Sequence, residues 1–438
     1  MSEIFIDFNK ETGKIKRMNA VNNGPILELH RENPFANRNN LELYKSMNIP
    51  YARLHDAPFF ATYGGNHTVD VHLIFTDFDA DPYDEKSYDF SCTDQLMKVI
   101  LMAGTKPFYR LGCSIEGHLP KKYAIYPPKD FKKWAVICEH IIAHYNEGWA
   151  DGFNMDIEYW EIWNEPNTPD MWLGTPEQFN DLYIITSKHI KGRFPHLKLG
   201  GPAFCNLDEV STAVWARPFL QRVKEEDAPL DFFSWHGYTL KIDYIIEKLR
   251  HARNMLDEYG FTETESILNE WNYAKDFSVA EYKQLLSIKG AAFTSAYISV
   301  CQDGPLDMLM YYDARPTVFN NLFDPDFYEP RKGYYVLKLW GELLKNEARQ
   351  CYAQCDIDDI YVTAAKYEDN NITIVTYYTD KTDMPERNIE LSIVNDREEY
   401  KNIYLLDGEN DMVNTDGITS SDGKYSLTIQ PNTVVVLR

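Results

Sequence analysis

The chain of 438 residues carries a formal net charge of −23 at pH 7. Its length is too great for one ordinary core and suits a large barrel with a small second domain. The hydrophobic share of 44% and the charged share of 25% are typical of a globular, soluble protein. The acidic balance argues against nucleic acid as a partner, and no run of about 18 apolar residues is present, so no membrane span is expected.

Seven cysteines are scattered singly along the chain. An odd number without a paired framework is typical of reduced thiols, and the sequence therefore predicts a cytoplasmic protein. The first ten residues agree with this prediction, because Glu3 and Asp7 interrupt the apolar run that a signal peptide would need. A homo-oligomer is left open, because nothing in the sequence indicates the oligomeric state.

Between residues 15 and 346 short apolar or β-branched runs alternate with longer amphipathic runs. Eight short runs are predicted strands: 15–22, 51–56, 106–112, 159–165, 197–203, 231–238, 266–271 and 307–313. Helices are predicted at 130–148, 175–194, 243–260 and 280–300. The second of these begins with Thr175, Pro176 and Gln178 in the spacing of a capping box.

Eight strands, each followed by a helix, predict an α/β fold of the (β/α)8 TIM barrel type. A doubly wound open sheet is the alternative. It favours a Gly-rich phosphate loop after the first strand, and the sequence has none there.

From residue 347 to residue 438 the pattern changes to period-2 runs separated by Asp, Asn and Gly. This alternation predicts an accessory C-terminal antiparallel β-sandwich. The first stretch, residues 1–14, is also strand-like and precedes the first strand of the barrel. We expect it to add a strand to the sandwich, which would tie both ends of the chain to one domain.

In TIM barrels the reactive groups lie at the C-terminal ends of the strands. The fourth predicted strand ends at Asn164 and Glu165, where Pro166 stops further pairing. The seventh ends at Glu270 and Trp271. Three other strand ends carry polar or aromatic residues: Arg53 and His55 in the second, His236 and Tyr238 in the sixth, and Tyr312 and Asp313 in the eighth.

Glu165 and Glu270 would face each other across the barrel mouth. Two carboxylates about 5–5.5 Å apart perform retaining glycoside hydrolysis, in which one attacks the anomeric carbon and the other protonates the leaving oxygen and later activates water. The acid must be partly buried to stay protonated, and Trp160 and Trp163 are expected to supply that environment for Glu165. The nucleophile must stay ionised, which Arg53 would favour beside Glu270.

Two motifs carry a resemblance to a known family. The run "EIWNEPN" at 161–167, followed by "LNEW" at 268–271, resembles the acid/base and nucleophile motifs of the clan A retaining glycoside hydrolases. Within that clan the chain is most similar to glycoside hydrolase family 39, the β-xylosidase and α-L-iduronidase family. The runs "YARLHD" at 51–56, "KPFYRLG" at 106–112 and "DFFSWHGY" at 231–238 match its second, third and sixth strands.

The resemblance implies roles for single residues. Glu165 would be the acid/base, Glu270 the nucleophile and Asn164 the partner of the sugar 2-hydroxyl. Arg53 and Tyr238 would hold Glu270. The further sugar contacts under consideration are His55, His236, Trp271, Tyr312, Asp313 and Arg315.

Several of these residues also have simpler explanations. Arg53 would serve equally as a buried ion-pair partner of Glu161. Asp313 and Arg315 would serve as a surface ion pair, and Trp271 suits core packing as well as a sugar platform.

The combined expectation is a cytoplasmic, retaining exo-glycosidase that hydrolyses short plant-type oligosaccharides by double displacement, with β-xylosidase as the first choice. Residues 311–330 depart from the acidic contacts that β-xylosidases of the family carry there, so arabinose-containing or uronic-acid termini are alternatives, as is an endo-glycanase. A non-catalytic carbohydrate-binding barrel is the alternative from another class. The expected mechanism needs no cofactor. No metal site is expected either, because His140 and His144 have a zinc-like spacing but lack the glutamate of a metalloprotease.

Overall fold

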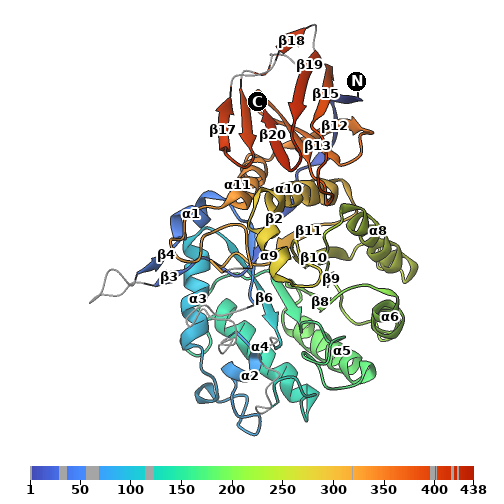
Figure 1. The fold of residues 1–438 in the computed structure, drawn as a ribbon. Coiled ribbons are helices and arrows are strands. Elements are labelled where there is room, and N and C mark those ends of the chain that lie inside the picture. Colours follow the sequence, from blue (N-terminus) through green and yellow to red (C-terminus); the bar gives the residue numbers. More distant parts are fainter. Residues whose placement is uncertain are drawn as a thin grey trace.

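The structure is a computed structural model, and it describes residues 2–28, 37–55, 69–113, 123–317, 319–394, 400, 402–415, 419–421 and 424–438. Figure 1 shows a barrel surrounded by helices, with a β-sheet domain above it in this view that contains both termini. Among the described helices, none combines the length and the apolar character that crossing a membrane requires.

Eight parallel strands close into a barrel, and each corresponds to one of the eight strands predicted from the sequence. In chain order they are β2 (Arg17–Asn22), β5 (Tyr51–Arg53), β6 (Lys106–Leu111), β7 (Tyr159–Ile162), β8 (Lys198–Phe204), β9 (Phe232–His236), β10 (Glu265–Trp271) and β11 (Met308–Tyr311). Strand β11 pairs with β2 and closes the ring. The predicted (β/α)8 barrel is therefore confirmed, with β7 as its fourth strand and β10 as its seventh.

The interior of the barrel changes from apolar to polar along the strands. Alternate strand residues point inward, and the apolar layers form a buried cluster of Ala20, Tyr51, Phe108, Tyr159, Phe232, Ile267, Met308 and Met310. Two residues further along their strands, Arg53, Glu161, Ser234 and Asn269 are fully buried and polar. This polar layer is the floor beneath the strand ends.

Helices cover the outside of the barrel (Figure 1). They are α1 (Leu41–Ser46), α2 (Val71–Ile74), α3 (Ser91–Met102), α4 (Phe131–Glu147), α5 (Pro176–Arg193), α6 (Glu209–Ser211), α7 (Arg217–Glu225), α8 (Ile242–Glu258), α9 (Val279–Leu285), α10 (Ile288–Asp303) and α11 (Lys332–Lys345). Minor elements are a 3₁₀ turn at Glu85–Ser87, a π-helical stretch at Thr212–Ala216, and the paired strands β3 (Leu27–Glu28) and β4 (Arg38–Asn39).

Two helix predictions have different outcomes. The capping box predicted at Thr175 and Gln178 is present at the start of α5. The single helix predicted at 280–300 is wrong, because the chain forms α9 and α10 there. The Ser287 side chain accepts the backbone N–H of Lys289, and this N-cap starts a new helix after α9 has ended.

The second domain is one continuous sheet of ten strands. They are β1 (Ser2–Lys14), β12 (Arg349–Cys355), β13 (Ile360–Tyr367), β14 (Asn370–Tyr377), β15 (Arg387–Val394), β16 (Ile403–Leu406), β17 (Asp411–Thr415), β18 (Thr419–Ser421), β19 (Lys424–Ile429) and β20 (Thr433–Leu437). Their order is β17-β16-β20-β14-β13-β12-β1-β15-β19-β18.

The N-terminal strand connects the two halves of this sheet domain. Strand β1 pairs with β12 in antiparallel and with β15 in parallel orientation, so it connects two sets of strands that would otherwise be separate sheets. The sheet still folds over a core of its own, to which strands from both halves contribute, including Ile4, Val375, Leu391 and Tyr425.

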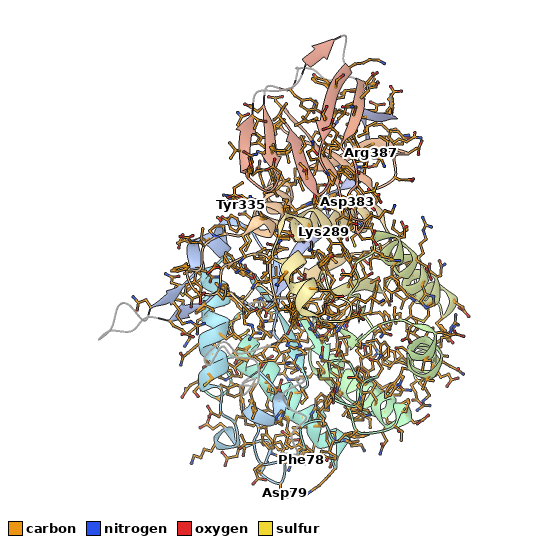
Figure 2. All side chains as sticks on the ribbon, in the orientation of Figure 1. Phe78, Asp79, Lys289, Tyr335, Asp383 and Arg387 are labelled. Carbon is orange, nitrogen blue, oxygen red and sulfur yellow. The ribbon has the colours of Figure 1, made fainter. Side chains whose placement is uncertain are left out.

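The sheet domain packs on α10 and α11 of the barrel. The Ser295 and Thr376 hydroxyls lie 2.7 Å apart, and Arg438 makes two hydrogen bonds of 2.9 Å to Glu342. Lys289 of α10 donates to the backbone carbonyl of Asp380 at 3.2 Å, and Figure 2 labels this lysine at the junction. The side chains of Figure 2 fill the space between both parts. A functional site is expected at the C-terminal ends of the barrel strands.

Candidate active site

Glu165 reaches the barrel mouth through an irregular end of β7. Trp163 has φ 77° and Glu165 has φ 46°, left-handed conformations that non-glycine residues adopt only when their surroundings hold them. They break the strand alternation, so that Asn164 and Glu165 both turn toward the mouth. The backbone N–H of Glu165 donates to the carbonyl of Ala203 in β8 at 2.9 Å, which fixes this turn.

Glu270 reaches the same space through an irregularity in β10. The pairing of β10 with β9 shifts register between Leu268 and Glu270. Asn269 can therefore reach Glu161 inside the barrel while its neighbour Glu270 also faces the mouth. Both carboxylates thus depend on local breaks in regular strand geometry.

The two carboxylates lie close together. Oxygen atoms of Glu165 and Glu270 and a ring nitrogen of His236 all lie within 4.8 Å of one another. Retaining glycosidases need carboxyl groups about 5–5.5 Å apart, whereas inverting enzymes need about 6.5–9.5 Å. The separation therefore fits direct attack on a sugar by one of the two groups.

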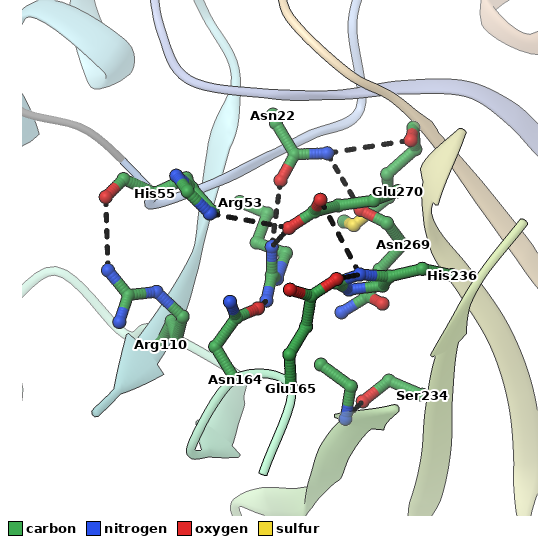
Figure 3. Close-up of polar contacts among 12 residues, drawn as sticks. Asn22, Arg53, His55, Arg110, Asn164, Glu165, Ser234, His236, Asn269 and Glu270 are labelled. Carbon is green, nitrogen blue, oxygen red and sulfur yellow. Dashed lines mark hydrogen bonds and ion pairs between the residues drawn. The ribbon is translucent and has the colours of Figure 1, made fainter. Parts of the chain in front are cut away.

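Arg53 connects several residues of the site (Figure 3). Its Nε donates to Glu161 at 2.7 Å, and its two terminal nitrogens donate to Glu270 at 2.7 Å and to Asn164 at 2.6 Å. Glu161 also accepts from Ser234 at 2.6 Å. Both explanations considered for Arg53 hold in the structure, since it pairs with Glu161 and contacts Glu270.

Three side chains surround the carboxylate of Glu270. Besides Arg53, the Tyr238 hydroxyl donates to it at 2.9 Å, and His55 Nε2 lies 3.4 Å away. These groups orient the carboxylate and stabilise its negative charge. His55 in turn packs edge-on against the ring of Tyr312 at 5.2 Å.

Glu165 has a different environment. Only 14% of its side chain is exposed, and burial raises the pKa of its carboxyl group, although Cys205, His55 and Arg53 act in the opposite direction. His236 Nδ1 lies 2.6 Å from its Oε1. Burial lowers the pKa of His236 to about 4, so the imidazole is neutral near pH 7 and shares a single proton with Glu165.

The tryptophans of β7 do not supply this environment, contrary to expectation. The Trp160 ring stacks on Tyr109 at 4.8 Å, and the Trp163 ring packs against Trp134 and Trp172. Strand alternation and the turn at Trp163 direct both rings outward, toward the helices. Enclosure of the mouth, rather than these two rings, desolvates Glu165.

Three residues considered as sugar contacts, Trp271, Asp313 and Arg315, are buried and pack or pair with other side chains. Trp271 is fully buried behind β10, where it stacks on Tyr297 of α10 at 4.1 Å, because the register shift that turns Glu270 inward turns its neighbour outward. Asp313 and Arg315 are buried rather than at the surface, and they pair with each other at 2.8 Å. Asp313 also accepts from Asn23 at 2.9 Å, so this pair fixes the loop after β11.

Two polar residues that the sequence reasoning did not single out support the site. Asn22 accepts from Arg53 at 3.0 Å and donates to the backbone carbonyl of Asn269 at 2.7 Å. Arg110 donates to the backbone carbonyl of His55 at 3.0 Å. Both lie at or near the C-terminal ends of barrel strands, which is the signal that would have found them.

The strand ends and their loops enclose a cavity of about 670 Å³, in the range of sites that hold drug-sized molecules. It is lined by His55, Glu165, Thr168, Asp170, Met171, Cys205, Asn206, Tyr238, Tyr244, Glu270, Lys275, Phe277, Tyr282, Tyr312 and Phe319. The aromatic residues 277, 282 and 319 lie in segments after β10 and β11 and were not predicted. Residue 56 and the loop behind it, up to residue 68, lie outside the described residues.

Two groups of side chains in the described part of the chain have a spacing that could hold a metal ion: Asp70 with His72 and Cys113, and Glu165 with His236 and Glu270. Each already has an arginine at hydrogen-bond distance. Arg110 lies 2.8 Å from Asp70, and Arg53 lies 2.7 Å from Glu270. In each group one carboxylate is therefore already paired with a guanidinium.

A closed (β/α)8 barrel with paired glutamates at the ends of its fourth and seventh strands defines the class of clan A retaining glycoside hydrolases. The family model described as "Glycosyl hydrolases family 39" matches residues 17–284, a range that includes both glutamates. The chain therefore belongs to glycoside hydrolase family 39, and that family is retaining.

Individual relatives agree with this assignment. A curated "Beta-xylosidase" of Geobacillus stearothermophilus is 25% identical over 259 residues, which cover 52% of this chain and 48% of that protein. The chain thus spans about half the length of the curated relative.

Solved structures share the fold over the whole chain. A glucosidase from Croceicoccus marinus has a TM-score of 0.75 at 18% identity, with 100% of this chain and 98% of that chain covered. A monomeric beta-xylosidase from Caulobacter crescentus CB15 has a TM-score of 0.71 at 16% identity, with 100% and 99% covered. At these identities the similarity concerns the fold.

Proposed function

We propose that the protein is a retaining exo-glycosidase that hydrolyses short oligosaccharides, with Glu270 as nucleophile and Glu165 as acid/base. The observation that carries this proposal is the pair of carboxylates within 4.8 Å of each other in contrasting environments. Cationic and neutral donors face Glu270, whereas burial raises the pKa of Glu165. Contrasting environments of this kind give two carboxylates different roles, here nucleophile for Glu270 and acid/base for Glu165.

In the first step a Glu270 oxygen attacks the anomeric carbon, and the bond from that carbon to the glycosidic oxygen breaks. Glu165 transfers its proton to the departing oxygen, so the leaving sugar departs as a neutral alcohol and a glycosyl ester forms on Glu270. In the second step Glu165, now ionised, removes a proton from water. That water attacks the anomeric carbon and releases Glu270, with net retention of configuration.

The neighbours of the two glutamates have distinct tasks in this mechanism. Arg53 and Tyr238 orient the Glu270 carboxylate, and neutral His236 holds the Glu165 carboxyl through its Oε1. Arg53 also fixes Asn164 by donating to its Oδ1, which leaves the amide N–H₂ to meet the 2-hydroxyl of the sugar. That contact strengthens as the transition state develops.

We propose β-xylosidase as the specific activity, on the support of the curated relative with that name. Asp313 and Arg315 pair with each other at 2.8 Å, and their role as sugar contacts stays part of the proposal. Arabinose-containing or uronic-acid termini and an endo-glycanase stay as alternatives. A non-catalytic binding barrel is the rival of another class, and the presence of both glutamates at catalytic separation argues against it.

A panel of activated aryl glycosides tests these alternatives together. We expect turnover of the aryl β-xyloside to exceed that of the arabinoside and the uronide, with retained anomeric configuration in the first product. Glu270→Ala should lower kcat by at least about 10⁴-fold, since the nucleophile is lost. No turnover on the whole panel would favour the binding barrel, and an inverted product would exclude double displacement.

An intracellular location with an imported, short substrate is part of the same proposal. All seven cysteines are free thiols in the structure, which supports a reducing compartment. Alkylation of the unfolded protein, quenched directly from cells without reductant, should modify all seven. Disulfide-bonded material in that experiment would argue for an oxidising compartment.

A further inference from the structure

We propose that Phe277 is the stacking platform of a leaving-group subsite, which binds the sugar ring next to the scissile bond. This inference rests on the proposed glycosidase function and specifies where the departing part of the substrate lies. Phe277 belongs to the segment between β10 and α9, directly after the strand that carries Glu270.

The segment around Phe277 is held in place by a carboxylate. Glu281 of α9 is 8% exposed, and it accepts the backbone N–H groups of Lys275 at 3.2 Å and Asp276 at 3.0 Å. Ser278 and Glu281 also form a capping box at the start of α9. The position of Phe277 is thus fixed from both sides before any ligand arrives.

The backbone of Phe277 is strained in a way that presents its ring to the solvent. Its φ is 53°, a left-handed conformation that is unfavourable for a bulky residue without a compensating constraint. Its side chain is nevertheless 48% exposed. A strained backbone that exposes an aromatic ring is not explained by core packing, which would bury the ring.

The exposed ring forms part of the catalytic cavity. Among the strongly exposed aromatic side chains of the described residues, Phe277 is the one that lines this cavity. It stacks on Phe319 at 5.6 Å with an angle of 24° between the rings. It also lies 5.5 Å from the ring of Tyr238, whose hydroxyl contacts Glu270 at 2.9 Å.

These contacts arrange the cavity by depth. Glu270 is 5% exposed, Tyr238 is intermediate and Phe277 is 48% exposed, so the accessibility of these side chains increases from the nucleophile to Phe277. The sugar that becomes attached to Glu270 must lie at the deep level. The ring that leaves after protonation by Glu165 then lies at the outer level, beside Phe277.

The chemistry of the outer level matches a sugar. A pyranose has an apolar face of C–H groups that suits an aromatic platform, and a rim of hydroxyl groups. Polar side chains that line the same cavity and are exposed, Lys275 and Asp170, provide a donor and an acceptor for such hydroxyls. The cavity of about 670 Å³ also has room for more than a single monosaccharide.

The test compares two substrates that share the sugar preferred by the wild type. One is the disaccharide, whose leaving group is a sugar ring, and the other is the glycosyl fluoride, whose leaving group is a single atom. Phe277→Ala should lower kcat/KM for the disaccharide about tenfold and leave the fluoride unchanged. Phe277→Tyr should restore the disaccharide value.

Val279→Ala is the matched control, because Val279, the first residue of α9, is 70% exposed and does not line the cavity. It should behave as the wild type on both substrates. A second readout is sugar transfer: the glycosyl ester of Phe277→Ala should pass less of its sugar to added monosaccharide acceptors than the wild-type ester does.

An equal loss on disaccharide and fluoride would overturn the subsite, since Phe277 would then act on the deep sugar or through Tyr238. An unchanged disaccharide value would overturn it as well. Failure of the wild type on both substrates would instead refute the glycosidase proposal itself.

Discussion

The guanidinium of Arg53 donates to the carboxylate of Glu270 at 2.7 Å, and the arginine is completely buried. Burial disfavours its charge, but Glu161 and Glu270 outweigh that effect and raise the pKa of Arg53. Arg53 therefore forms ion pairs both with Glu161 in the barrel floor and with Glu270, the proposed nucleophile, at the mouth.

This geometry predicts a double effect of Arg53→Lys. Lysine keeps the charge but lacks the planar fork that reaches Glu161, Glu270 and Asn164 at once. We expect kcat to fall by about 10²-fold or more and the free energy of unfolding to fall by about 3 kcal/mol. Steady-state kinetics and urea unfolding measure the two effects. Arg217→Lys, at a partly exposed position, is the control, and its stability should stay within about 1 kcal/mol of the wild type.

Glu165→Ala should separate protonation from attack. We expect kcat to fall by about 10²–10⁴-fold on substrates with poor leaving groups, which need the proton, and formation of the glycosyl ester to persist with activated aryl substrates. Added azide should accelerate turnover of the aryl substrate and yield a glycosyl azide, because azide attacks the ester without base assistance. Absence of that product would contradict the acid/base assignment.

The raised pKa of Glu165 has consequences for pH dependence. Because the native carboxyl holds its proton more tightly than the unfolded one, its contribution to stability is complete below the unfolded pKa and is lost as pH rises through the native pKa. Glu165→Gln, which never ionises, should therefore be more stable than the wild type at about pH 7 and lose this advantage at about pH 4. It should also lack the decline of kcat/KM at high pH.

Urea unfolding at both pH values measures the stability part of this prediction. Glu258→Gln is a control of opposite sign, because the hydrogen bond from Arg217 lowers the pKa of Glu258. A wild type that exceeds Glu165→Gln in stability at neutral pH would show that Glu165 is not desolvated as described.

The lowered pKa of His236 predicts that the folded protein loses stability as the pH falls. Its pKa is lowered to about 4, against about 6.5 in an unfolded chain, so the unfolded state binds the proton first as pH falls. The protein should lose up to about 3 kcal/mol between about pH 6.5 and pH 4 from this group alone. His236→Gln should remove that part of the loss in urea unfolding, whereas the exposed His196→Gln should not. Parallel acid profiles of wild type and His236→Gln would refute the prediction.

The eight barrel strands and the places of Glu165 and Glu270 could be predicted, because hydrophobic patterns and the strand-end rule carry over directly to a TIM barrel. The directions of single side chains could not. Period-2 parity fails where φ becomes positive at Trp163 or where β10 shifts register, so the sequence could not decide between core packing and a sugar platform for Trp271. The burial of Asp313 could not be predicted from the sequence either, because Asp313 pairs with Asn23, which lies far away in the sequence.

The position of β1 affects how the protein can be assembled. Ile4 pairs with Cys355 on one side and with Leu391 on the other, so this strand finds both neighbours only after the entire barrel has been synthesised. Until then its two edges are unsatisfied and open to foreign strands. The sheet domain can therefore be completed only after both of these neighbours have been synthesised. A slow final folding phase, sensitive to other chains in the vicinity, follows from this order of events.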